Sequence, residues 1–213
     1  IAFRTENMLE DMVTAGEEPY YNRAYSFAQN TSQGSNYITC SYFWDAYYTY
    51  IKSCTDIIST IVPETANDEA LNYLGIAHTY RALFYLDLAR LFEPKENKYT
   101  DVSKVLGLTV PIVTEETTEE SATNNPRVDR ETMYAFILSE LQKAETYIDP
   151  TANGYTKPSL GAIYGLYART YLEMGAAGDE GAYEKAAYYA EEAIKASGRT
   201  PLSQVQWEDP TNG

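Results

Sequence analysis

Five tyrosines and one asparagine near the N-terminus have side chains suited to holding a sugar: Tyr20, Tyr21, Tyr25, Asn36, Tyr37 and Tyr42. A tyrosine ring can lie against the apolar face of a pyranose, and amide and hydroxyl groups can bond its hydroxyls. The segment that carries most of them is rich in Asn, Ser, Gln and Tyr and has no helical stripe. A wet recognition loop fits this composition. An equally good interpretation is that these rings only pack the loop onto helices.

Catalytic and metal chemistry have few candidate residues. His78 is the single histidine, and neither a Ser nor a Cys lies near it at helical spacing, so a histidine triad is disfavoured. The acidic pairs Glu115-Glu116, Glu119-Glu120 and Glu191-Glu192 are expected to be solvated neighbours, and no stretch has the alternating acids of a calcium loop. We therefore expect no catalytic residue, no metal and no cofactor. A glycoside hydrolase, which needs only two facing carboxylates, stays as an alternative.

The charge balance narrows the choice of partners. The 213 residues include 16 Lys+Arg and 31 Asp+Glu, which gives a formal net charge of −15 without any local basic cluster. Such a field repels phosphate backbones, so no nucleic-acid partner is expected. Cys40 and Cys54 are either two thiols or one bridge. Two thiols are favoured because Cys54 falls on a buried stripe, whereas Cys40 precedes the helix.

Hydrophobic periodicity predicts an all-α fold. Five amphipathic helices are expected, with prolines and glycines at their edges, over residues 43–61, 67–92, 129–148, 158–175 and 183–198. Asp129 is the expected N-cap of the third helix, and Gly198 the expected end of the last. Short links and alanine-rich faces indicate TPR-like antiparallel hairpins, an α-α superhelix, although a regular 34-residue period is absent. The expected organisation is one domain, 1–213, with an irregular loop at 17–41, hairpins at 42–92 and 129–198, and a loop excursion at 93–128.

Three large side chains are assigned structural roles. Arg81 lies in an apolar stripe, where an unpaired guanidinium would be costly. A carboxylate from another helix is therefore expected beside it, and the candidates are Asp45, Asp56 and Glu140. Arg127, after Pro126, is expected to tether a loop to a helix, and Trp44 is expected in the core.

An ordered set of blocks resembles the SusD/RagB-type proteins. The blocks are Phe43–Tyr48 leading into Ile51 and Cys54, the helix Tyr80–Phe92 with its Arg-Ala-x-x-Tyr pattern, Gly107–Val113 like a Val-Pro-Leu strand, Pro126–Ala144, and Ser159–Leu172 with Tyr183–Ile194. The resemblance covers roughly residues 40–213. It departs from the family pattern where Glu93–Leu106 intervenes, and family members continue beyond such a C-terminus into a second lobe.

The resemblance implies the N-terminal, TPR-bearing portion of a surface lipoprotein in the outer membrane of bacteria of the Bacteroidetes type, without its C-terminal lobe. The lipid anchor would lie upstream of Ile1. Such a protein binds glycan without catalysis and delivers it to a SusC-like TonB-dependent transporter. A TPR-type adaptor for a peptide or protein is the alternative from another functional class.

Overall fold

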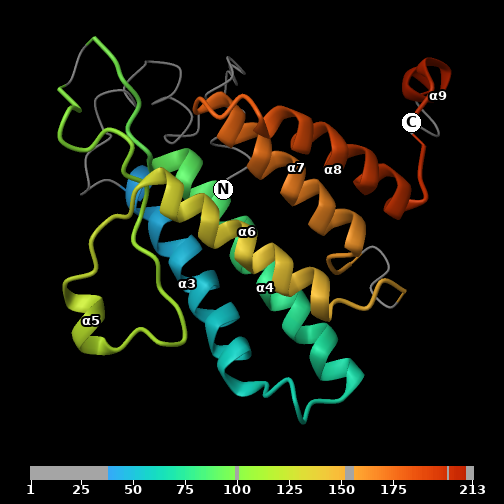
Figure 1. Ribbon diagram of the computed structural model, residues 1–213, viewed down its shortest axis with the longest axis horizontal. Coiled ribbons are helices and arrows are strands. Elements are labelled where there is room, and N and C mark those ends of the chain that lie inside the picture. The colour runs from blue at the N-terminus through green and yellow to red at the C-terminus, as the bar shows by residue number, and fades with distance from the viewer. Residues whose placement is uncertain (1–37, 99–100, 152–155, 201, 210–213) are drawn as a thin grey trace, which may run out of the picture. The chain divides into compact units, whose positions relative to one another are not determined.

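The computed structural model describes residues 38–98, 101–151, 156–200 and 202–209. Within these ranges the chain forms seven helices (Figure 1). They are α3 (Ile38–Thr60), α4 (Asp68–Phe92), α5 (Glu119–Thr123), α6 (Arg130–Tyr147), α7 (Leu160–Ala176), α8 (Ala182–Ser197) and α9 (Gln204–Glu208). The predicted all-α class is confirmed. None of these helices is long and apolar enough to cross a bilayer.

The chain divides into two compact units, Ile1–Thr49 and Tyr50–Gly213. In the first unit the described part is the beginning of α3. There the Trp44 and Tyr48 rings lie 4.9 Å apart, and Trp44 is half-buried. Its assignment to the core therefore stays a prediction, as does the grouping of 1–213 into one domain.

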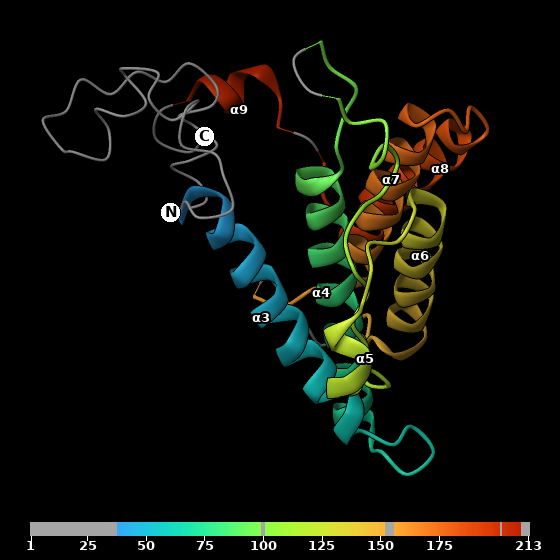
Figure 2. The same ribbon diagram turned by 90° about the vertical axis from the view of Figure 1, so that its left-hand side faces the viewer.

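The second unit is a row of four long helices. Helix α4 packs on α6, α6 on α7, and α7 on α8, and both views show them side by side (Figures 1 and 2). The fully buried side chains at these seams come mainly from α4 and α6, and include Tyr85, Leu86, Met133, Ile137 and Leu141. The end of α3 joins this core through Cys54 and Ile58, which pack with Leu74 and Ala77 of α4.

Helix ends follow local chemistry. The side chain of Asn67 accepts a bond from the Ala70 amide at the start of α4, and Asp129 does the same for Thr132 at the start of α6, as predicted. Helix α8 ends at Gly198, which has a left-handed φ of 62°. The sequence predicts that Pro158 lies in the first turn of this helix. In the structure Ser159 is the N-cap of α7, so Pro158 lies just outside the helix.

Several expected boundaries are corrected. Helix α3 begins at Ile38, so residues 38–41 are helical and Cys40 does not precede the helix. Helix α7 continues one residue past Gly175. The excursion 93–128 contains α5, and α9 follows α8, although neither short helix was expected. Cys54 is a free, buried thiol, and burial raises its pKa to about 11.

A stack of tyrosines fills the seam between α7 and α8. The ring of Tyr189 lies 4.5 Å from that of Tyr167 and 5.6 Å from that of Tyr171, nearly parallel to both. Tyr188 meets Tyr189 edge to face, and Tyr164 lies 5.9 Å from Tyr189. Offset stacking of this kind stabilises the seam beyond simple burial of area.

Candidate functional site

Most of the predicted sugar-binding residues fall outside the described part of the chain. Tyr20, Tyr21, Tyr25, Asn36 and Tyr37 lie there, and their assignment stays a prediction. Tyr42 is described: it lies on α3, is half-buried, and meets the Phe43 ring edge to face at 5.6 Å.

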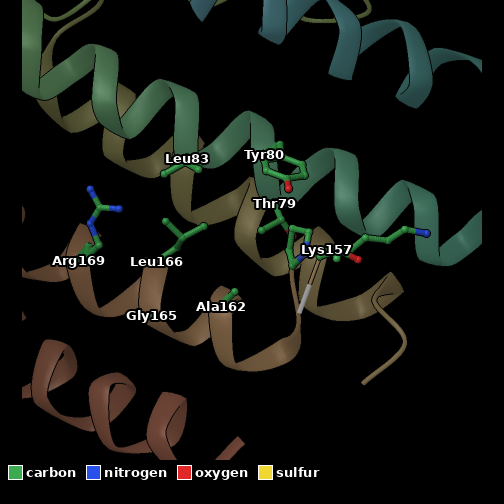
Figure 3. Close-up of a pocket in the computed structure, with 10 residues that line it drawn as sticks. Thr79, Tyr80, Leu83, Lys157, Ala162, Gly165, Leu166 and Arg169 are labelled. Atoms are coloured by element: carbon green, nitrogen blue, oxygen red, sulfur yellow. The ribbon is translucent and has the colours of Figure 1, made fainter. Parts of the chain in front are cut away.

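A separate groove opens between α4 and α7 in the second unit. It encloses about 430 Å³ and is shown in Figure 3. The residues that line it are Thr79, Tyr80 and Leu83 of α4, Thr156, Lys157 and Pro158 before α7, and Ala162, Gly165, Leu166 and Arg169 of α7. Helical spacing explains the α7 wall, because Ala162, Leu166 and Arg169 are four and three residues apart.

Two small residues create the hollow. Gly165 has no side chain, and a Cβ built there would meet nothing within 4 Å. Ala162 occupies the same face one turn earlier and adds only a methyl group. The gap between α4 and α7 therefore stays open over this stretch, while Leu166 closes its floor.

The aromatic wall of the groove is supported from behind. Tyr80 is half-buried, and its ring stacks on Phe84 at 5.8 Å with an interplanar angle of 17°. Tyr80 and Phe84 also pack against the cluster formed by the buried side chains of α3 and α4. The ring is thus held in place before any ligand arrives.

The two ends of the groove are cationic. Figure 3 shows Lys157 at one end and Arg169 at the other, with Leu83 and Leu166 between them. Arg169 donates to Asp87 at 3.2 Å through Nη2. Lys157 Nζ lies 4.7 Å from the centre of the Tyr73 ring. An apolar floor, an aromatic wall and cationic ends suit the binding of a polar ligand.

A buried ionic cluster joins three helices and the loop excursion. Arg81 donates from Nε to Glu140 at 2.7 Å, and from Nη1 to Glu115 at 2.7 Å and Thr55 at 3.3 Å. The expected carboxylate partner on another helix is confirmed as Glu140. Asp56 instead pairs with Lys52 on the surface. Glu115, expected to be a solvated neighbour of Glu116, is an exposed residue whose side chain, 32% exposed, also forms an ion pair with Arg81.

Glu140 also binds His78, a contact that sequence reasoning missed. The His78 Nδ1 donates to Glu140 Oε2 at 2.8 Å, and both side chains are at most 4% exposed. Burial alone would raise the pKa of Glu140. The hydrogen bonds from His78 and Arg81, with the positive charge of Arg81, outweigh it and lower that pKa to about 2. No buried side-chain nitrogen or oxygen of the described residues, this cluster included, lacks a hydrogen-bond partner.

The excursion 93–128 is tied down at two further points. Arg127 Nη1 donates to the carbonyls of Phe92 and Thr109, the loop-to-helix tether expected for it. The Tyr85 hydroxyl donates to the Val113 carbonyl at 3.0 Å and accepts from the Val113 amide at 2.7 Å. These tethers position Glu115 beside Arg81.

The chain matches the model of a known protein family. The family model for SusD-like proteins, described as starch-binding and associating with the outer membrane, matches residues 1–172. The chain belongs to the SusD-like family. The match includes the first 39 residues of this SusD-like chain, which the sequence resemblance did not reach, and with them the predicted tyrosine segment.

Solved structures agree with this assignment. A SusD superfamily protein from Parabacteroides distasonis aligns with a TM-score of 0.70 at 21% identity over 94% of this chain and 40% of its own. A putative sugar binding protein from Bacteroides vulgatus aligns with a TM-score of 0.58 at 26% identity, over 83% of this chain and 36% of its own. The SusD-like chain thus spans well under half the length of these structures. No curated protein matches it.

Proposed function

We propose that this protein binds oligosaccharides without transforming them, at the outer surface of the outer membrane. The observation that carries the proposal is the SusD-like family match over residues 1–172, whose description combines starch binding with the outer membrane. The 26% identical structure from Bacteroides vulgatus, a putative sugar binding protein, supports the same ligand class.

The proposed role also includes delivery of the bound glycan to a transporter. The protein would hand its glycan to a SusC-like TonB-dependent transporter and would be held at the membrane by a lipid anchor upstream of Ile1. This part rests on the family alone.

Two regions are proposed to contact glycan. The first comprises Tyr20, Tyr21, Tyr25, Asn36, Tyr37 and Tyr42, whose rings and amide suit a sugar surface. The second is the α4–α7 groove, where the Tyr80 ring is held by Phe84. Both supply aromatic area next to hydrogen-bonding groups, the combination that selects sugars from water.

The test is a glycan array followed by calorimetry of the positive glycans. We expect saturable binding without release of reducing ends. Replacing each of the five N-terminal tyrosines, and separately Tyr80, by alanine should remove or weaken binding in at least one case. Tyr188→Ala is the matched control, because Tyr188 is 58% exposed on α8, outside both regions.

Two results would overturn the proposal. Release of new reducing ends would make the protein a hydrolase. Absence of binding to every glycan would favour the adaptor, whose ligand is a peptide or protein.

A further inference from the structure

We propose that the α4–α7 groove takes an acidic oligosaccharide, with uronate carboxylates or sulfate esters held by Lys157 and Arg169. This inference rests on the proposed function, because it names the class of glycan that this groove selects.

The charge of the groove is opposite to that of the chain. Over the whole sequence 31 acidic residues outnumber 16 basic ones. Among the described residues that line the groove there are two cations and no carboxylate. An anionic ligand is repelled by most of this molecule, so a local site of the opposite sign is needed to hold it.

Lys157 is oriented but not neutralised. Its ammonium lies over the Tyr73 ring and 3.5 Å from the Tyr73 hydroxyl, and no carboxylate of the described chain forms an ion pair with it. A cation over an aromatic face keeps its full charge while losing freedom of movement. Lys157 can therefore bind an anion at little further cost in side-chain entropy.

Arg169 keeps donors available at the other end. A guanidinium has five N–H donors, and Asp87 takes the contact through Nη2. The Arg169 side chain is 46% exposed and lines the groove. Guanidinium groups bind carboxylate and sulfate-like oxygens in a planar, directional way.

The space between the cations fits the body of a sugar chain. Leu83, Ala162 and Leu166 provide an apolar floor, and Tyr80 provides an aromatic wall. From Leu160 to Arg169 the helix rises about 14 Å. A ligand that reaches both Lys157 and Arg169 must be longer than a single sugar, and an oligosaccharide with repeated acidic groups meets that condition.

The experiment compares acidic oligosaccharides with neutral partners of the same sugar sequence. The probes for calorimetry are oligogalacturonate and its methyl ester, and sulfated galactan oligosaccharide and its desulfated form. We expect at least one acidic member to bind at least about tenfold more tightly than its neutral partner. The uronate and sulfate arms show which acid the groove takes.

Two variants locate the effect. Lys157→Met and Arg169→Gln should each weaken binding of the acidic probe about five- to tenfold, and should equalise the acidic and neutral members of the pair. The matched controls are Lys185→Met, whose ammonium also lies over a tyrosine ring, and Arg90→Gln, whose guanidinium also pairs with one carboxylate and is 47% exposed. Both controls should bind like the wild-type protein.

The outcomes separate this inference from the proposed function. If neutral glycans bind as tightly as acidic ones, or if Lys157→Met and Arg169→Gln leave affinity unchanged, the inference fails and glycan binding stands. If an acidic peptide binds in the groove and no glycan does, both fail. If the protein binds no glycan at all, the proposed function fails first.

Discussion

Glu140 satisfies two buried basic side chains with one carboxylate. His78 and Arg81 both donate to its Oε2, and Lys143 reaches Oε1 from the surface. Glu140→Gln keeps the size of the side chain but removes its charge. The Arg81 guanidinium then remains buried with Glu115 as its one ionised partner. We expect a loss of about 3 to 5 kcal/mol in the free energy of unfolding, measured by urea denaturation.

Asp56→Asn is the control for that substitution. Asp56 also pairs with one cation, Lys52, but its side chain is 62% exposed, so the loss should stay within about 0.5 kcal/mol. Equal losses for the two variants would show that the buried cluster contributes no more than a surface ion pair.

The ion-pair partner of a residue could be predicted where a charged side chain lies in an apolar stripe. Arg81 lies in such a stripe and therefore needs a carboxylate partner, and Glu140 is one of the three predicted candidates. The partnership of His78 with Glu140 left no local trace, because 62 residues separate them. The ion pair of Glu115 with Arg81 left no local trace either, because 34 residues separate the two.

At the scale of elements, the Tyr85 hydroxyl fastens the excursion 93–128 to α4. Tyr85→Phe removes both bonds to Val113, and the Val113 amide and carbonyl lose their partner. We expect a loss of about 1 to 3 kcal/mol and faster hydrogen exchange in residues 109–117. Tyr188→Phe, at an exposed position, should change neither quantity. Unchanged exchange in Tyr85→Phe would mean that Arg127 and Glu115 hold the segment without Tyr85.

Two helical glycines should respond to alanine in opposite directions. A Cβ at Gly75 would lie 2.6 Å from the Ile148 amide nitrogen, so α4 and the end of α6 must separate. Gly75→Ala should cost about 1 to 3 kcal/mol. Gly165→Ala meets open space in mid-helix and should gain about 0.5 to 1 kcal/mol. Thermal unfolding of both variants checks the pair, and a stabilised Gly75→Ala would contradict the close approach.

The long helices could be predicted because period, caps and breakers agree along each of them. Asn67, Asp129 and Gly198 each mark an end that the structure confirms. Helices α5 and α9 have five residues each, too few to show a hydrophobic period. Their capping boxes, Thr118 with Ser121 and Ser203 with Gln206, were the only available signals.

For the whole molecule, the carboxylates set how stability responds to acid. Desolvation alone would raise the pKa values of Glu115 and Glu93, but their salt bridges to Arg81 and Arg130 outweigh it and lower both, and the pKa of Glu140 falls to about 2. Groups with lowered pKa stabilise the fold above the ordinary glutamate value of 4.5, and that stability is lost as the pH falls toward 2. Between pH 7 and 5, protonation of exposed acids relieves the self-repulsion of a −15 chain.

We therefore expect stability to rise slightly toward pH 5 and to fall steeply below pH 4.5. Urea denaturation at a series of pH values measures the profile. In Glu140→Gln the fall should be shallower, because the group with the lowest pKa is gone. If stability falls equally steeply below pH 4.5 in the wild-type protein and in Glu140→Gln, carboxylates other than Glu140 cause the fall.

The groove could not be predicted from the sequence, because its residues come together only in the folded chain. Lys157 and Arg169 are ordinary surface cations in sequence, and Tyr80 belongs to a helical stripe. They line one hollow only because α4 and α7 lie beside each other in the fold. In the sequence, Tyr80 and Lys157 are 77 residues apart. No periodicity encodes such a crossing. Composition did establish the acidic background against which the groove stands out.

The tyrosine stack between α7 and α8 gives this seam an optical signature of its own. The chain has 21 tyrosines and two tryptophans, so its near-ultraviolet absorption comes largely from phenol rings. Nearly parallel rings at 4.5 and 5.6 Å couple their transitions, and we expect their contribution to the near-ultraviolet circular dichroism to be lost when α8 leaves α7. Burial and Glu145 raise the pKa of Tyr164 to about 12. The pKa values of Tyr85 and Tyr134 on other helices are raised as well, so the circular dichroism of the stack, and not alkaline titration alone, follows the separation of this helix pair.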